Sequence, residues 1–206
     1  MAEQDIYYSL KQASEGSYKE KGSKFLAYAY PVSTEAEVKS HLDGLKKQYY
    51  DARHHCYAFI FKAEEGREET YRANDDGEPA HTAGDPILGQ IRSQNLHDVL
   101  VVVIRYFGGT KLGVPGLIHA YKTATADALA NNQIVKKLIL KTFEVRFAYT
   151  ATNEVMQLID KFEAQIEAQD FAEDCYYMLA VPRSRWLDAK EEFSKAQDVI
   201  VMDNEG

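Results

Sequence analysis

The sequence predicts an α+β protein with two domains, residues 1–135 and 138–206. The first observation is a unit between residues 98 and 129 that reads as strand, glycine-rich loop and helix. The second is a new pattern from residue 138 onward, in which strands and helices follow the order β-α-β-β-α-β of a ferredoxin-like sandwich. The boundary is expected at residues 133–137, after Asn131 and Asn132 end the helix.

Residues 4–31 are expected to form two strands. Apolar residues alternate with polar ones from Ile6 to Leu10 and from Phe25 to Ala29, and Glu15 to Ser17 marks the loop between the strands. Three lysines near this loop form either a solvated edge or a ligand contact: Lys19, Lys21 and Lys24.

A helix is predicted from about Glu35 to Tyr50. Thr34 and Glu37 have the spacing of a capping box, and apolar residues follow at helical intervals. A strand is then expected to begin just after Cys56.

A partner strand is predicted near residues 69–72. Turn-forming residues crowd between Ala73 and Pro86, which predicts a long loop of the kind that is often functional. A short helix near Ile87 leads into the central strand.

The central strand is the apolar run from Val99 to Ile104, which is typical of a strand buried on both faces. Gly108 to Gly113 and a helix beginning near Pro115 follow. Glycines permit φ > 0 and close ligand approach, and N–H groups at a helix start attract anions. Neither a Walker motif nor G-x-G-x-x-G is present, so the loop is either an anion site or a tight connection, and no cofactor is predicted.

The second domain contains a strand over residues 138–149, a helix capped by Asn153 and a hairpin over residues 166–181 that turns at Glu173-Asp174. A second helix capped by Ser184 and a strand at 199–202 complete it. No motif in this domain predicts chemistry.

Composition excludes several classes of protein. The chain has 206 residues, 45% of them hydrophobic and 27% charged, as in ordinary globular proteins. No apolar run approaches the roughly 18 residues that span a bilayer, and the acidic N-terminus is unlike a signal peptide. Cys56 and Cys175 are far apart and are expected to be reduced thiols. We therefore predict a cytoplasmic protein without membrane contact.

The net charge of −8 is unevenly distributed. Residues 138–206 contain 7 Lys and Arg and 14 Asp and Glu. Residues 1–137 contain the other 17 Lys and Arg and the other 18 Asp and Glu. Because an acidic protein repels bulk nucleic acid, any RNA contact is expected from a local basic face of the first domain. The second domain suits a protein partner or serves solubility alone.

One candidate site is hydrolytic or metal-binding. Histidine and carboxylate ligands suit zinc or a harder ion, but the spacing matches no known motif, and such residues also cap turns. Cys56 beside His55 is expected to be a buried, inert thiol. We expect no bound metal, and a metal-dependent or small-molecule hydrolase remains the alternative function. Its residues are His54, His55, Asp75, Asp76, Glu78 and His81.

Four segments carry a resemblance to a known family. These are Asp51–Cys56, Asn74–Pro79, Thr82–Pro86 and Arg105–Gly113. In this order they resemble the IMPACT family in its bacterial, YigZ-type form, a group of uncharacterised or translation-linked proteins. The chain departs from the family's usual residues at His81, Asp85, Pro115 and His119.

The resemblance implies a first domain similar to domain IV of elongation factor G and a ferredoxin-like second domain similar to its domain V. It also implies a non-enzymatic translation regulator, because eukaryotic relatives bind a partner in a pathway that restrains translation. RNA, the ribosome or a translation-regulatory protein is the expected partner. The oligomeric state is not predicted.

The resemblance brings cationic, aromatic and glycine residues of the first domain together as a docking surface. The alternative is that Arg105 pairs with Asp75 or Asp76 and pins the long loop to the glycine turn. Residues expected to contact the ligand are Arg53, His54, Arg105, Tyr106, Gly108, Gly109, Lys111 and Gly113, beside His119 and Lys122. Residues expected to support the loop are Asp75, Asp76, Glu78 and Thr82.

Overall fold

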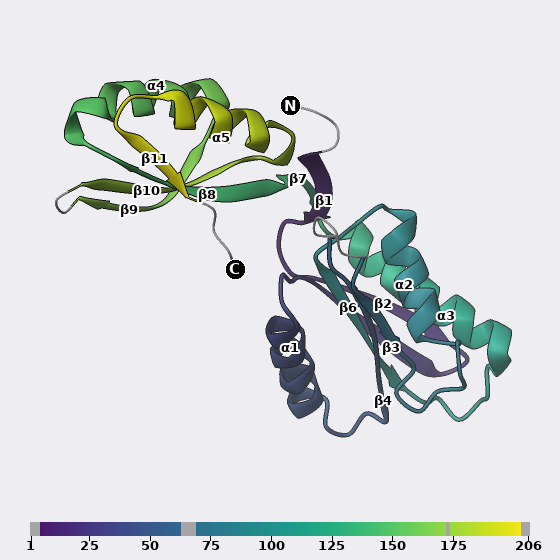
Figure 1. The fold of residues 1–206 in the computed structure, drawn as a ribbon. Coiled ribbons are helices and arrows are strands. Elements are labelled where there is room, and N and C mark those ends of the chain that lie inside the picture. Colours follow the sequence, from purple (N-terminus) through teal and green to yellow (C-terminus); the bar gives the residue numbers. More distant parts are fainter. Residues whose placement is uncertain (1–4, 63–68, 172–173, 203–206) are drawn as a thin grey trace. The chain divides into compact units, whose positions relative to one another are not determined.

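The computed structural model describes residues 5–62, 69–171 and 174–202, and its chain divides into two compact units (Figure 1). The first unit runs from Tyr7 to Lys136, and the second from Lys137 onward. Asp5 and Ile6 group with the second unit, whereas the sequence placed them in the first domain. Asp5 explains this, because its Oδ1 accepts the N–H of Ser184 at 2.8 Å.

The chain forms helices and strands in mixed order, as an α+β protein does. Within the described residues, no helix is both long and apolar enough to cross a membrane. The elements up to residue 138 are β1 (Ile6–Leu10), β2 (Ser14–Glu20), β3 (Ser23–Pro31), α1 (Glu35–Gln48), β4 (His54–Ile60), β5 (Tyr71–Asn74), α2 (Gly84–Ser93), β6 (Val99–Tyr106), α3 (Gly113–Ala130) and β7 (Ile134–Leu138).

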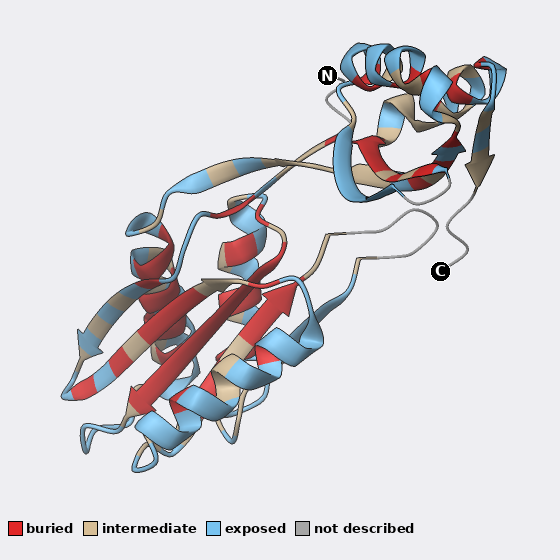
Figure 2. Cartoon of the chain, turned by 90° about the vertical axis from the view of Figure 1, so that its left-hand side faces the viewer, coloured by how far each residue is buried: buried red, intermediate tan, exposed pale blue. Residues whose placement is uncertain are grey.

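A five-stranded antiparallel sheet in the order β2-β3-β6-β4-β5 organises the first unit. The central strand β6 is buried on both faces, as its unbroken apolar run predicts (Figure 2). Val99, Val101 and Val103 belong to the core with α2 and α3, and Leu100 and Val102 belong to the core with α1. Helices α2 and α3 therefore cover one face, and α1 covers the other (Figure 1).

The predicted cap of α1 by Thr34 is confirmed, but the return bond from Glu37 goes to Ser33 rather than to Thr34. The N–H of Glu37 donates to Thr34 Oγ1 at 3.2 Å, and the N–H of Ser33 donates to Glu37 Oε2 at 2.6 Å. Two of the N–H groups at this helix start thus have acceptors.

Two strands of the first unit were not predicted. β2 includes the residues expected to form a loop, Glu15 to Ser17, and a Cβ at Gly16 would lie 2.2 Å from the backbone nitrogen of Ala128. The glycine thus permits close packing against α3 rather than a turn. β7 occupies the expected linker and pairs with β1 in a two-stranded sheet.

The second unit has the element order that the sequence predicts. Its elements are β8 (Leu140–Phe147), α4 (Thr152–Phe162), β9 (Gln165–Phe171), β10 (Cys175–Pro182), α5 (Trp186–Lys195) and β11 (Val199–Met202). The strands form an antiparallel sheet in the order β11-β8-β10-β9. Phe143, Val145 and Leu179 pack with Ile159 of α4 and Phe193 of α5, so both helices lie on one face.

Both predicted helix caps in this unit are wrong. α4 begins after Ala151 and α5 after Arg185, and neither helix has a side-chain cap. Asn153 lies inside the first turn, and Ser184 donates to Asp5 instead. In the hairpin turn at Glu173-Asp174, residue 173 lies outside the described residues.

Gly89 offers a test of helix propensity. It lies exposed inside α2, and a Cβ there would meet no atom within 4 Å. We expect Gly89→Ala to raise the free energy of unfolding by about 0.5–1 kcal/mol, because alanine loses less backbone entropy than glycine on folding. Urea denaturation compares the two proteins, and an unchanged or lower value would contradict the expectation.

Candidate functional site

A buried ion pair ties the long loop to the end of β6. Arg105 Nη1 lies 2.6 Å from Glu78 Oε1, and the side chains are only 7% and 4% exposed. The predicted pairing of Arg105 with Asp75 or Asp76 is thus corrected to Glu78. Arg105 still holds the long loop in place, as expected, because this pair joins the loop to the strand that leads into the glycine turn.

The ion pair continues into a buried chain of polar groups. The Tyr121 hydroxyl donates to Glu78 Oε1 at 2.8 Å, and Cys56 Sγ lies 3.3 Å from the Tyr121 hydroxyl and 3.0 Å from the Asp75 carbonyl oxygen. Burial raises the pKa of Cys56 and the pKa of Tyr121 above their ordinary values. Cys56 therefore remains a thiol at neutral pH, as expected for an inert side chain.

Asp75 organises the loop from within. Its Oδ1 accepts the N–H groups of Ala83 and Gly84 at 2.9 and 2.8 Å, and its Oδ2 accepts the N–H of His81 at 2.9 Å. Burial acts to raise the pKa of this carboxyl, but the bonds to Gly84, His81 and Ala83 outweigh it, so the pKa is lowered. Asp75 thus provides the cap that Ala83 cannot give to α2.

Asp76 holds the two histidines at the start of β4. Its Oδ2 accepts the N–H of His55 at 2.7 Å, and its carbonyl oxygen lies 2.9 Å from His54 Nδ1. Burial lowers the pKa of His55, despite the opposing effect of the Asp76 charge. Both histidines are therefore engaged in holding the loop.

His81, by contrast, lies at the surface of the loop. Its side chain is 82% exposed, and its Nδ1 lies 2.7 Å from Asp85 Oδ2. Its φ of +66° falls in the left-handed region, which explains why a glycine suits this position. Thr82 is buried and donates to the Pro79 carbonyl at 2.7 Å. In the described part of the chain, no three His, Cys, Asp or Glu side chains could hold a metal ion together.

The glycine loop combines a packing role with open backbone. A Cβ on Gly108 would lie 1.8 Å from the carbonyl carbon of Gly22, so only glycine fits against the β2–β3 turn. Gly109 and Gly113 have φ of +87° and +72°. A Cβ on Gly109 would meet nothing within 4 Å, which leaves its backbone open to solvent.

The glycine loop lies at the end of the sheet where β6 stops and β3 and β4 start (Figure 1). The register pairs Tyr106 with Lys24, and Arg105 with His54. Phe107 is 56% exposed, and its ring lies 5.6 Å from the Arg105 guanidinium carbon. We call these exposed residues the cationic rim: Lys21, Lys24, Arg53, Phe107 and Lys111.

Several predicted contact residues have partners within the first unit, as His54 has in Asp76. Tyr106 donates to Asp51 Oδ1 at 2.8 Å, a bond that raises its pKa to about 12. Arg105 is buried against Glu78. His119 packs edge-on against the Tyr18 ring, with ring centres 5.7 Å apart, and Lys122 is exposed on α3.

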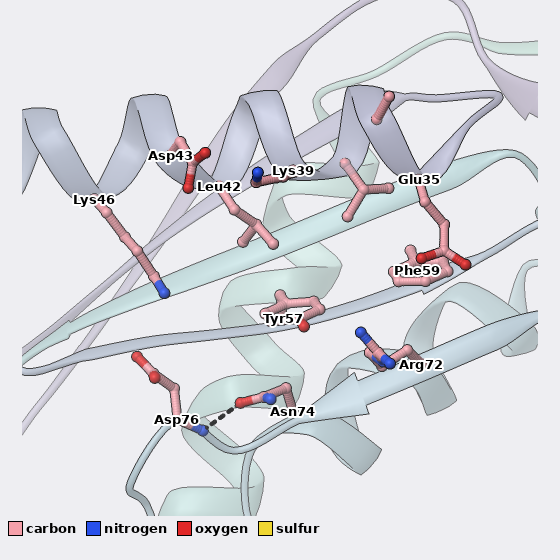
Figure 3. Close-up of a pocket in the computed structure, with 12 residues that line it drawn as sticks. Glu35, Lys39, Leu42, Asp43, Lys46, Tyr57, Phe59, Arg72, Asn74 and Asp76 are labelled. Carbon is pink, nitrogen blue, oxygen red and sulfur yellow. Dashed lines mark hydrogen bonds between the residues drawn. The ribbon is translucent and has the colours of Figure 1, made fainter.

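The site prediction did not include a groove between α1 and strands β4 and β5 (Figure 3). Its volume is about 480 Å³, and its apolar lining consists of Ala36, Val38, Leu42, Tyr57 and Phe59. We call it the α1 groove. The alternating charges at Glu35, Lys39, Asp43 and Lys46 were the signal in the sequence, but such a pattern is also typical of a solvated helix face. The charged and polar residues that line it are Glu35, Lys39, Asp43, Lys46, Arg72, Asn74 and Asp76.

The sequence matches a family of proteins over most of its length. The Impact N-terminal domain matches residues 21–129. The IMPACT family member YvyE of Bacillus subtilis is 32% identical over 186 residues, which cover 90% of this chain and 81% of that protein. YigZ of Escherichia coli is 28% identical over 80% of each chain. A Dictyostelium discoideum IMPACT homolog is 39% identical over 55% of this chain and 32% of its own length.

A solved structure shares the fold over nearly the whole chain. The crystal structure of a hypothetical protein superimposes with a TM-score of 0.71, at 24% identity, over 98% of this chain and 99% of the other. This likeness concerns the fold alone.

Proposed function

The chain belongs to the IMPACT family, and from this membership we propose that it is a non-enzymatic, translation-associated regulator that binds RNA or the ribosome through its first domain. Relatives named IMPACT homologs in eukaryotes, such as that of Dictyostelium discoideum, share the matched region. A translation-regulatory protein is the second class of partner that this membership suggests.

The cationic rim is the observation that carries the proposal. Four side chains with positive charge, Lys21, Lys24, Arg53 and Lys111, are exposed at one end of the sheet beside the exposed ring of Phe107. The start of α3 lies in the same loop and has neither a side-chain cap nor an acidic residue in its first turn. Its N–H groups and positive dipole end therefore favour an anion such as phosphate.

The fold supports the same proposal by analogy. We infer that residues 138–206 form a ferredoxin-like domain, because the element order and the sheet order β11-β8-β10-β9 agree with that fold. For residues 1–135 we infer a sandwich comparable to domain IV of elongation factor G. Likeness of fold suggests a ribosomal setting but does not by itself assign an activity.

The alternative, a hydrolase, gains no support from the loop. The carboxylates of Asp75 and Glu78 are occupied by backbone N–H groups and by Arg105 and Tyr121 respectively. His54 bonds the backbone of Asp76. These side chains hold the loop together, which leaves none of them positioned as a general base.

Ribosome co-sedimentation and filter binding of RNA over a salt series test the proposal. We expect association that weakens with salt, and we expect Arg53→Glu together with Lys111→Glu to reduce affinity at least about tenfold. The slope of log affinity against log salt should fall by about 1.4–1.8, the value for two lost phosphate contacts.

Lys136→Glu is the matched control. It reverses one charge, as each of the two rim substitutions does, at an exposed position on β7 of the first unit, away from the glycine loop. It should leave the affinity within about twofold of the wild type. The absence of salt-sensitive binding, or equal losses in the control and the rim variant, would refute RNA binding through the rim.

A further inference from the structure

The α1 face of the five-stranded sheet is only partly covered. Five strands at about 4.8 Å spacing span about 19 Å, which is the width of two packed helices. Two helices, α2 and α3, lie on one face, and in the described part of the unit α1 alone lies on the other. The α1 groove is the space that remains beside it, above β4 and β5 (Figure 3).

The two flanks of α1 differ. On one flank, His41 stacks on Tyr30 with ring centres 4.0 Å apart. On the flank that lines the groove, Glu35, Lys39, Asp43 and Lys46 have no ion pair with any described residue. These four charges are therefore available to a neighbour.

Their order makes the flank complementary to itself. Along α1 the signs run negative, positive, negative, positive. When two such helices lie side by side in opposite directions, Glu35 faces Lys46 of the other copy, and Lys39 faces its Asp43. A two-fold axis repeats each pair, so opposite charges meet at four places.

The outer surface of α1 would also permit close contact. Ala36, Ser40 and Gly44 recur every four residues and are exposed. A Cβ on Gly44 would meet nothing within 4 Å. Small side chains at this spacing let a helix lie close against a second surface, here the open strands β4 and β5 of another copy.

We propose that the occupant of the α1 groove is α1 of a second copy of this chain. The two helices lie antiparallel in one layer between two five-stranded sheets, and each helix covers the Tyr57 surface of the other copy. Residues 1–137 carry a net charge of only −1, so the first units of two copies do not repel each other strongly. The interface is isologous and closes at two copies.

Sedimentation velocity of the full chain over a concentration series tests this dimer. We expect the wild type to dimerise, and Lys39→Glu and Asp43→Lys each to weaken dimerisation about tenfold or more, because each places like charges opposite each other twice. An equimolar mixture of the two variants should recover the dimer, since Glu at 39 then meets Lys at 43 across the interface, and Lys39 meets Asp43.

Recovery in the mixture separates pairing between copies from any effect within one helix, because each variant keeps its own intrahelical change. Lys19→Glu, on β2 at the opposite edge of the sheet, makes the same charge change and should leave dimerisation unchanged. A wild type that stays monomeric at every concentration, or a dimer that persists unaltered in both single variants, would overturn the proposal.

Discussion

We expect Glu78→Ala to lower the unfolding free energy of the first unit by about 3–5 kcal/mol. The substitution leaves the Arg105 guanidinium buried without its counter-ion and removes the acceptor of the Tyr121 hydroxyl. Because Arg105 is only 7% exposed, water cannot replace the lost carboxylate without the loop moving. Urea denaturation followed by far-ultraviolet circular dichroism measures the loss.

An exposed ion pair provides the matched control. Arg92 and Glu69 have nearly the same separation, 2.7 Å, but their side chains are 44% and 33% exposed. We expect Glu69→Ala to lower the unfolding free energy by less than about 1 kcal/mol, because solvent screens this pair. If Glu78→Ala and Glu69→Ala lowered the unfolding free energy equally, burial of the ion pair would not be the cause of the larger effect expected at Glu78.

A double substitution separates the ion pair from the packing. Glu78→Leu combined with Arg105→Met removes both charges. The loss of unfolding free energy in this double variant should be smaller than the sum of the losses that Glu78→Leu and Arg105→Met cause singly. Additive losses would mean that the two side chains do not stabilise each other. The only tryptophan, Trp186, lies in α5 of the second unit, so its fluorescence reports on the unit that these variants do not touch.

The sequence predicts well the elements that local patterns specify. The capping box of α1, the apolar run of β6 and the glycines before α3 each contain their own signal within a few residues. β2 lacks such a signal, because its polar residues form a strand only by pairing with β3 and packing on α3. Ser184 resembles a helix cap until Asp5, distant in the chain, becomes its partner.

The site shows the same limit. The sequence indicates that an acidic loop meets Arg105. By charge alone, four carboxylates are equally good candidates for the partner of Arg105: Asp75, Asp76, Glu78 and Asp85. Backbone geometry decides among them: Asp75 is used by the start of α2, Asp76 by β4 and Glu78 by Arg105. The α1 groove escapes prediction because a charged helix flank has the same pattern whether it faces water or a partner.

We expect Asp75→Asn to lower the unfolding free energy by about 2–4 kcal/mol at neutral pH. The carboxylate accepts three backbone N–H groups, from His81, Ala83 and Gly84, and charged acceptors contribute more than neutral ones. Asparagine offers one oxygen in place of two, so at least one of these donors loses its partner. Asp85→Asn, in the exposed first turn of α2, should lower the free energy by less than about 1 kcal/mol.

The loss of stability in Asp75→Asn should depend on pH if the negative charge of Asp75 is its cause. The pKa of Asp75 in the folded chain is lowered from 3.8, so the unfolded chain binds the proton more tightly. The carboxylate therefore stabilises the fold fully above about pH 5, and this contribution is lost as the pH falls through the folded pKa. The difference in unfolding free energy between wild type and Asp75→Asn should be constant from pH 5 to 8 and decrease below about pH 4. A difference that is equally large at pH 3 would mean that the geometry of the Asp75 side chain, and not its charge, holds the loop to α2.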